Sequence, residues 1–488
     1  MKVEQLSKNQ VLNNSFWKLL ESIGSSGIQL LITIILARLL TPHDYGLMTI
    51  VLVVVTFLSL FVNSGISSFL VYNSDIRKEH FLTTLMLNIL VSTILMLIIA
   101  FGADPIAVFY ESPSLKPLII AMAITLPFNA VAAVYNAYAM KFSYFKTLFV
   151  RNMISLPISG VMAMILAYYG YGVWALVVQQ ISSSALLALI MVVSIRVDIE
   201  GEWKIEKSII KPMLKYGGYV LITTIIAFIS DNISDLLIGK KISPKQLGYY
   251  NRGCYFPNAF TNVANGVLCG VLFPAFASYN SDIVELKARF RKTIRLLYYG
   301  MFPLFLGLIA CSRPLTLSLL TDKWAFSIPI MQIICLYYMI IPFLQTCSQV
   351  SLATGYVRLR MTGEVVKMVF TIPLLFFLVS YGIEAVALAR VLVNVILVAY
   401  SMYINGKIMD YKYSELFSDL SKPLLIGGLL FLCIYPLSYL AIDDVAIVVL
   451  QIIVGISLYL FFIKVLHIKE MEEMTSLVLA KIRKKKNG

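Results

Sequence analysis

Charged residues are scarce in this sequence of 488 residues. Asp, Glu, Lys and Arg together make up 14% of it, whereas about 25% is typical of a soluble domain. This scarcity excludes a water-soluble enzyme. Hydrophobic residues make up 59% of the sequence, which excludes intrinsic disorder, because a disordered chain has low hydrophobicity. We therefore predict a helical protein that crosses a membrane many times.

Cysteine and histidine are also rare. The six cysteines form no CxxC pair, and the three histidines lie too far apart for an HExxH zinc motif. The sequence also lacks a GxxxxGK[ST] phosphate loop. These absences argue against a disulfide framework, a metal centre and a nucleotide-driven pump. We expect no cofactor, apart from H⁺ or Na⁺ as a coupling ion.

Long apolar runs dominate the sequence instead. A membrane-spanning helix needs about 20 mostly apolar residues. Fourteen segments meet this criterion: 15–37, 45–66, 81–102, 117–138, 150–169, 173–195, 213–238, 250–275, 294–315, 326–348, 361–381, 385–406, 421–441 and 444–466. We predict an all-α polytopic membrane protein with 14 transmembrane helices. Residues 1–16 contain no apolar core followed by a cleavage site, so we expect no removed signal peptide.

Lys and Arg outnumber Asp and Glu by 40 to 26, which gives a formal charge of +14. In a soluble protein this excess would suggest nucleic-acid binding. Here the cations gather in alternate short loops and in the tail at 481–486. Short loops rich in Lys and Arg stay on the cytoplasmic side, where anionic lipids attract them. We therefore predict two cytoplasmic termini and no nucleic-acid partner.

The sequence contains an internal repeat. Residues 36–46 (LARLLTPHDYG) recur as 238–248 (IGKKISPKQLG), 72–75 (YNSD) recur as 279–282, and 169–176 (YGYGVWAL) recur as 381–388 (YGIEAVAL). Each copy holds six predicted spans, and an even number makes both copies enter the membrane in the same direction, as in parallel transporter repeats. We predict two pseudo-symmetric lobes at 1–197 and 198–407, followed by the last two helices and the tail at 408–488.

Polar residues inside the predicted spans follow helical spacing. They usually face the interior of a helix bundle or a water-filled cavity. The first helix carries Lys18, Ser22, Ser25, Gln29 and Thr33 on one face with Glu21 beside them, and the eighth carries Asn251, Tyr255, Asn258, Asn262 and Asn265. We predict that both stripes line a cavity between the lobes. The alternatives are snorkelling of Lys18 to the interface and helix–helix hydrogen bonding by the Asn stripe.

The intramembrane charges suggest an anionic substrate. A diphosphate head crosses the hydrocarbon only if it is partly neutralised, and guanidinium groups bind phosphate in a bidentate manner. Our candidates for diphosphate binding are the cations Lys18, Arg151, Arg390 and Lys367. Our candidates for coupling-ion binding are the acids Glu21, Asp231, Asp235 and Glu364. Structural pairing of Glu364 with Lys367, and hydration of the two aspartates at the outer mouth, are the alternatives.

Three motifs carry a resemblance to a known family. Residues 37–46 (ARLLTPHDYG), 65–68 (GISS) and 172–177 (GVWALV) resemble the polysaccharide-exporting flippases of the multidrug/oligosaccharidyl-lipid/polysaccharide exporter superfamily, which includes O-antigen, colanic-acid and teichuronic-acid exporters. An Asp is common in that family two residues before the glycine of the second motif, where this chain has Asn63. This departure puts a role for that acid in doubt.

The resemblance implies a fourteen-helix, bilobed fold in a bacterial cytoplasmic membrane. It also implies cation-coupled transport of undecaprenyl-diphosphate-linked oligosaccharide to the outer leaflet, for surface polysaccharide synthesis. A groove for the lipid tail is expected on the last two helices, at 421–466. We expect a monomer, with membrane lipids and the lipid-linked oligosaccharide as ligands. Polysaccharide polymerase and chain-length proteins are the expected protein partners.

Two alternative functions remain open on sequence grounds. A drug or cation antiporter of the same superfamily would share the fold and have a more apolar cavity, and Asp231 and Asp235 are compatible with it. A membrane glycan polymerase or ligase would need a sizeable outer loop for its catalytic residues. The loops here are short, and the acidic pair Asp443–Asp444 falls in a tight turn. We therefore favour a transporter and assign no catalytic residue.

Overall fold

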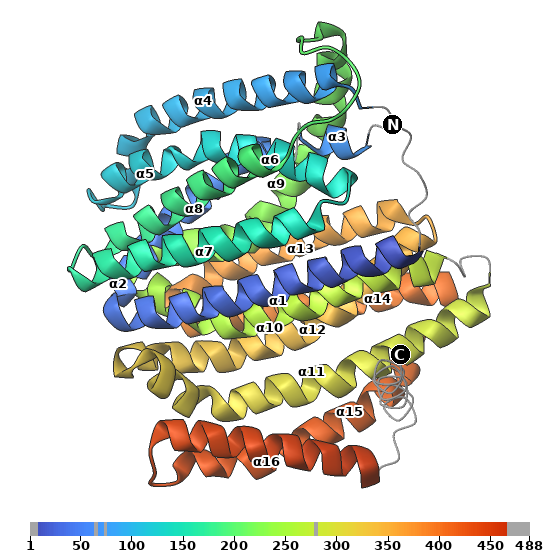
Figure 1. Cartoon of the computed structure of the whole chain (residues 1–488). Helices are drawn as coiled ribbons and strands as arrows, with labels where there is room; N and C mark the ends of the chain where they lie inside the picture. Colours follow the sequence, from blue (N-terminus) through green and yellow to red (C-terminus); the bar gives the residue numbers. More distant parts are fainter. Residues whose placement is uncertain (1–7, 63–66, 73–75, 278–281, 466–488) are drawn as a thin grey trace, which may run out of the picture. The chain divides into compact units, whose positions relative to one another are not determined.

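The computed structural model describes residues 8–62, 67–72, 76–277 and 282–465, and these residues form helices and connections without any strand (Figure 1). By packing, the chain divides into two compact units that meet at Asn251 and Arg252, inside one helix. The first unit holds α1 (Lys8–Leu39), α2 (Pro42–Leu60), α3 (Ser67–Tyr72), α4 (Lys78–Phe109), α5 (Leu115–Ala123), α6 (Thr125–Lys141), α7 (Phe145–Tyr168), α8 (Val173–Ser194), η2 (Lys207–Ile209), α9 (Ile210–Lys241) and the start of α10 (Pro244–Ala277).

The second unit contains the rest of α10 and the helices that follow it. They are α11 (Ile283–Leu320), η3 (Asp322–Ser327), α12 (Ile328–Ala353), α13 (Val357–Leu378), η4 (Val379–Tyr381), α14 (Ile383–Met409), α15 (Tyr413–Ile434), η5 (Tyr435–Tyr439) and α16 (Asp444–Val465). The predicted lobe boundaries after residues 197 and 407 were drawn from the sequence repeat, whereas the two units are defined by packing. The lobe boundaries therefore stay predictions.

Thirteen helical segments among the described residues are long and apolar enough to cross a membrane. Where their residues are described, the predicted spans fall on helix, and the span at 117–138 consists of α5 and α6, which meet at Ile124. The difference in number lies in α10, which covers the predicted span 250–275 but is not among the thirteen. Most side chains of this span lie outside the described part of the structure. A multi-pass, all-helical membrane protein is confirmed.

In the first unit, α1 packs along α7, and α4 and α8 pack on α6 (Figure 1). The approach of α1 to α7 is close, since a β-carbon on Gly160 would lie 2.4 Å from Ile32 Cδ1. The connection after α8 folds back onto the start of α4. There the Glu202 N–H donates to Glu79 Oε1 at 2.7 Å. The longest hydrophilic connection of the sequence is therefore held against the first unit.

The repeated Thr/Ser-Pro motif begins two helices that touch. Thr41 caps α2 by accepting a hydrogen bond from the Asp44 N–H, while Asp44 accepts one from the Thr41 N–H, a capping box. Pro42 stands in the first turn of α2, where its missing N–H costs no helical hydrogen bond. One turn later, Gly46 meets the Pro244 backbone at the start of α10. The motif thus sets both the start of a helix and a close contact.

In the second unit, α11 is the element on which the last two helices pack. Its 38 residues extend over about 57 Å, which exceeds the roughly 30 Å of a bilayer core. Ser438 of η5, directly after α15, donates to the Ala310 carbonyl at 2.9 Å, and Tyr459 of α16 donates to the Tyr299 carbonyl at 2.9 Å. A β-carbon on Gly427 would come within 3.0 Å of Phe302. Both helices are therefore attached to α11.

Candidate functional site

A polar cluster joins α1 to α7 within the first unit. Lys18 Nζ lies 2.7 Å from Glu21 Oε2. Asn152 of α7 donates to the other oxygen of the same carboxylate, Oε1, at 3.1 Å, and to Ser25 Oγ at 3.3 Å. The Glu21 residue is only 6% exposed. A buried carboxylate is costly unless it is paired and hydrogen-bonded, and both conditions are met here.

Arg151 is the second cation of this cluster. It precedes Asn152 on α7 and interacts electrostatically with Glu21. Its Nε–H is buried and donates no hydrogen bond among the described residues. Lys18, by contrast, has a side chain that is 59% exposed. The structure therefore brings together four predicted residues, three proposed for the substrate and one for the coupling ion, in the α1–α7 cluster (Lys18, Glu21, Ser25, Arg151, Asn152).

The rest of the predicted α1 stripe differs in exposure along the helix. Ser22 and Gln29 are half-buried, whereas Thr33 is 6% exposed. Thr33 is therefore part of the packed interior of the unit. The structure supports a polar face on the first half of α1 more than on its second half.

The two predicted acids on α9 lie in the second half of that helix. Asp231 is exposed, and Asp235 is half-buried and faces Tyr110, which follows α4. Burial, together with the negative charge of Asp235, raises the pKa of Tyr110 to about 12. Nearby, Lys240 Nζ lies 2.7 Å from Glu111 Oε1, and this bond lowers the pKa of Glu111. These acids belong to a region of mixed charge, and their coupling-ion role stays a prediction.

The Asn stripe of α10 is only partly described. Asn251 is half-buried and Asn258 is exposed, whereas the side chains of Asn262 and Asn265 lie outside the described part of the structure. Tyr255 is half-buried, and the Arg252 guanidinium lies 5.0 Å from the centre of its ring. Arg252 is 8% exposed and was not among the candidate cations. It is a buried cation that sequence reasoning missed.

The remaining predicted cation sites lie in the second unit. The Arg390 guanidinium lies 4.4 Å from the centre of the Tyr337 ring, which is a cation–π contact. Glu364 and Lys367 are half-buried on α13. Whether these residues share one chamber with the α1–α7 cluster stays a prediction, because each unit is described by itself.

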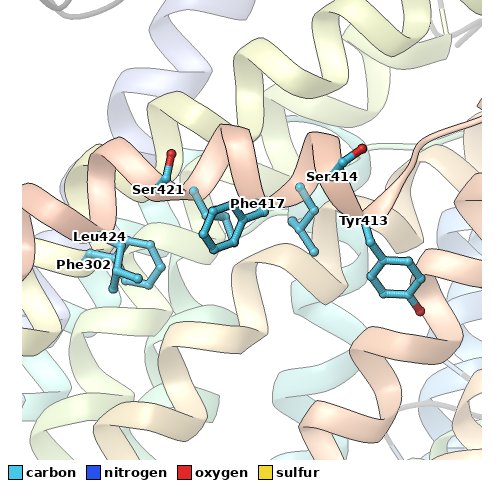
Figure 2. A pocket seen from close by; sticks show the side chains of 8 residues that line it. Phe302, Tyr413, Ser414, Phe417, Ser421 and Leu424 are labelled. Carbon is cyan, nitrogen blue, oxygen red and sulfur yellow. The ribbon is translucent and has the colours of Figure 1, made fainter.

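An apolar groove of about 630 Å³ follows the first half of α15. We call it the α15 groove, and Figure 2 shows its lining: Phe302 of α11, and Tyr413, Ser414, Leu416, Phe417, Leu420, Ser421 and Leu424 of α15. Two serines and a tyrosine supply its polar side chains. The resemblance placed a lipid-tail groove on 421–466; this one begins earlier, at Tyr413, and is completed by α11 rather than α16.

Buried charge holds α15 in place beside the groove. Asp419 is 1% exposed and accepts two hydrogen bonds from Arg291, each at 2.9 Å, in a bidentate pair. Arg295 and Tyr411 donate to the same carboxylate at 3.2 and 3.1 Å. Burial and the charge of Asp419 raise the pKa of Tyr411. This cluster, which the sequence analysis missed, attaches the groove wall to α11.

Metal-ligating side chains do not gather anywhere in the described ranges: no group of three or more His, Cys, Asp or Glu residues could hold a metal ion there. The polar clusters are instead built from cations paired with single carboxylates.

Comparison with known proteins bears on the family. A family model described as "Polysaccharide biosynthesis protein" matches residues 35–329. The chain belongs to this family. The succinoglycan biosynthesis transport protein ExoT of Rhizobium meliloti is 24% identical over 67% of this chain and 66% of its own. The lipopolysaccharide biosynthesis protein WzxC of Escherichia coli is 21% identical over 67% of each chain.

The fold of this polysaccharide biosynthesis family member has been seen before. The lipid II flippase MurJ, in an inward closed conformation, superposes with a TM-score of 0.75, over 93% of this chain and 99% of that one, at 16% sequence identity. This likeness shows a shared fold. The polysaccharide biosynthesis family is shown by the family model itself.

Proposed function

We propose that the protein is a flippase that moves diphosphate-linked, lipid-anchored oligosaccharide across the bacterial cytoplasmic membrane for surface polysaccharide synthesis. The observation that carries this proposal is the combination of two cations, Lys18 and Arg151, gathered around the buried Glu21 with an apolar groove on α15. A diphosphate needs cations, and a polyprenyl tail needs apolar surface. The names of ExoT and WzxC support the same substrate class.

The division of roles follows from the chemistry of the residues. Lys18 and Arg151 neutralise the diphosphate, with Arg390 and Lys367 as further cations. The α15 groove holds part of the polyprenyl tail, and the asparagines of α10 contact sugar hydroxyls. Glu21, Asp231, Asp235 and Glu364 are the proposed sites for a coupling H⁺ or Na⁺. Alternating access requires no covalent intermediate, so the protein acts as a transporter rather than an enzyme.

Orientation and partners complete the proposal. The charge bias of the short loops supports two cytoplasmic termini in the inner membrane. We propose a monomeric carrier that passes its product to a polysaccharide polymerase and to chain-length proteins. The natural substrate is then a repeat unit assembled on the cytoplasmic side.

Deletion of the gene tests the proposal. Cells lacking the protein should accumulate lipid-linked repeat units in the inner leaflet and lose surface polysaccharide, and the cloned gene should restore both. Normal polysaccharide together with new sensitivity to lipophilic cations would favour the drug antiporter instead. Accumulation of repeat units in the outer leaflet would indicate a polymerase or ligase.

A further inference from the structure

The Glu21 carboxylate stands where an anionic substrate would bind. It is buried and forms an ion pair with Lys18 at 2.7 Å. It also interacts electrostatically with Arg151. Both cations are the ones to which the proposed function assigns the diphosphate. A diphosphate and Glu21 therefore compete for the same positive charge.

The carboxylate is also held in position from the neighbouring helix. Asn152 donates to Glu21 Oε1 at 3.1 Å and to Ser25 Oγ at 3.3 Å. The first of these bonds uses Oε1, whereas Lys18 contacts the other carboxylate oxygen, Oε2. Asn152 can thus keep Glu21 bound to α7 even when an anion takes over Lys18. The side chain then has a defined place in both situations.

A carrier that exports its substrate must also return empty. Two unpaired cations, one of them with a buried Nε (Arg151), would oppose that return, because an uncompensated charge in the membrane is costly. Resting on the proposed function, we propose that Glu21 acts as a built-in anion: it neutralises Lys18 and Arg151 in the empty carrier and yields them to the diphosphate when substrate binds. Asn152 is its positioning residue.

This role has a kinetic signature that a merely structural ion pair lacks. Without the built-in anion, the cations are free for substrate, so the affinity for a diphosphate should rise. The empty carrier should return more slowly, so net transport should fall. Exchange of substrate for substrate should persist, because the loaded carrier crosses in both directions and never needs Glu21.

The test uses the full-length protein in proteoliposomes with undecaprenyl diphosphate as the probe. For Glu21→Gln we expect affinity to rise about five-fold, the amount set by removing one competing ion pair. Net flux should fall while exchange stays near wild type. Asn152→Ala, which keeps all charges, should change both quantities in the same direction but less. Glu384→Gln is the matched control, since Glu384 is exposed at the start of α14.

Several outcomes would overturn the inference. Unchanged or weaker binding in Glu21→Gln, or equal losses of net flux and exchange, would show that Glu21 only holds α1 to α7. If Glu21→Gln does not fold, the same comparison in Asn152→Ala decides the matter. Failure of the wild-type protein to move the probe would contradict the proposed function instead, and the binding comparison would still judge the role of Glu21.

Discussion

Gly46 and Pro244 touch so closely that a β-carbon on Gly46 would lie 1.6 Å from the Pro244 carbonyl oxygen. The reciprocal pair has the same relationship, since a β-carbon on Gly248 would lie 1.8 Å from the Pro42 carbonyl oxygen. These four residues are the Pro and Gly of the two copies of the repeated motif. The first turns of α2 and α10 therefore pack against each other through a pseudo-symmetric pair of glycine–proline contacts.

We expect Gly46→Ala and Gly248→Ala to abolish or strongly reduce export. The obstacle in each case is backbone, which cannot rotate away as a side chain would, so the two helices must separate. The measurement is export in complemented deletion cells together with thermal unfolding of the purified protein. Gly102→Ala is the control, because a β-carbon there meets nothing within 4 Å. Normal export in both variants would contradict the importance of this contact.

Asp419→Asn should loosen α15 from α11. It leaves Arg291 and Arg295 without their shared buried carboxylate, which should lower the free energy of unfolding by up to about 3 kcal/mol. This value is the low end of the range for breaking a buried ion pair, and it applies because both arginines are partly exposed. Thermal unfolding in detergent measures the change. Asp443→Asn, in the exposed turn before α16, should leave the melting temperature unaltered. Equal melting temperatures for the two variants would show that Asp419 is not an anchor.

Leu420→Asn should weaken binding of long polyprenyl chains. Leu420 lines the α15 groove, and losing the burial of one leucine corresponds to about a ten-fold weaker affinity. Binding of undecaprenyl diphosphate should suffer, whereas farnesyl diphosphate, whose tail is short, should bind as before. Leu432→Asn is the control, because Leu432 is exposed on α15 away from the groove. Equal effects on both chain lengths would argue against a tail site here.

Arg390→Lys should reduce transport about ten-fold or more, because lysine keeps the charge but loses the planar fork and its stacking on Tyr337. Tyr337→Phe retains the aromatic face and should transport nearly normally. The readout is flux in proteoliposomes, compared with Arg313→Lys, a conservative change at an exposed position of α11. Full activity of Arg390→Lys would leave this residue with a packing role only.

Local patterns in the sequence predicted the helices and part of the α1–α7 cluster. Apolar runs of sufficient length indicate spans because a bilayer demands them, and the described residues of these runs fall on helix. Lys18 and Glu21 are three residues apart, so their pairing follows from helix geometry. Arg151 was a diphosphate candidate at an inner interface, where the orientation of the chain also explains a cation; its approach to Glu21 depends on the packing of α7.

What escaped prediction depends on distant partners. Asp419 pairs with an arginine 128 residues away in the sequence, and no periodicity indicates which charges will meet. Asp419 lies just before the predicted span at 421–441, and an acid in such a position is usually interpreted as a solvated loop residue. Arg252 stands at the edge of the predicted span at 250–275, but α10 begins before it and its side chain is buried. Asn152 had no signal beyond its place next to Arg151.

Flipping by the purified protein tests the central claim most directly. Proteoliposomes would carry a fluorescent lipid-linked oligosaccharide diphosphate in both leaflets, and a membrane-impermeant quencher would be added outside. We expect wild-type protein to make nearly all the label accessible over time, and Lys18→Gln combined with Arg151→Gln to leave about half protected, as in protein-free vesicles. Protection of half the label by correctly folded wild-type protein, with or without an ion gradient, would contradict the account.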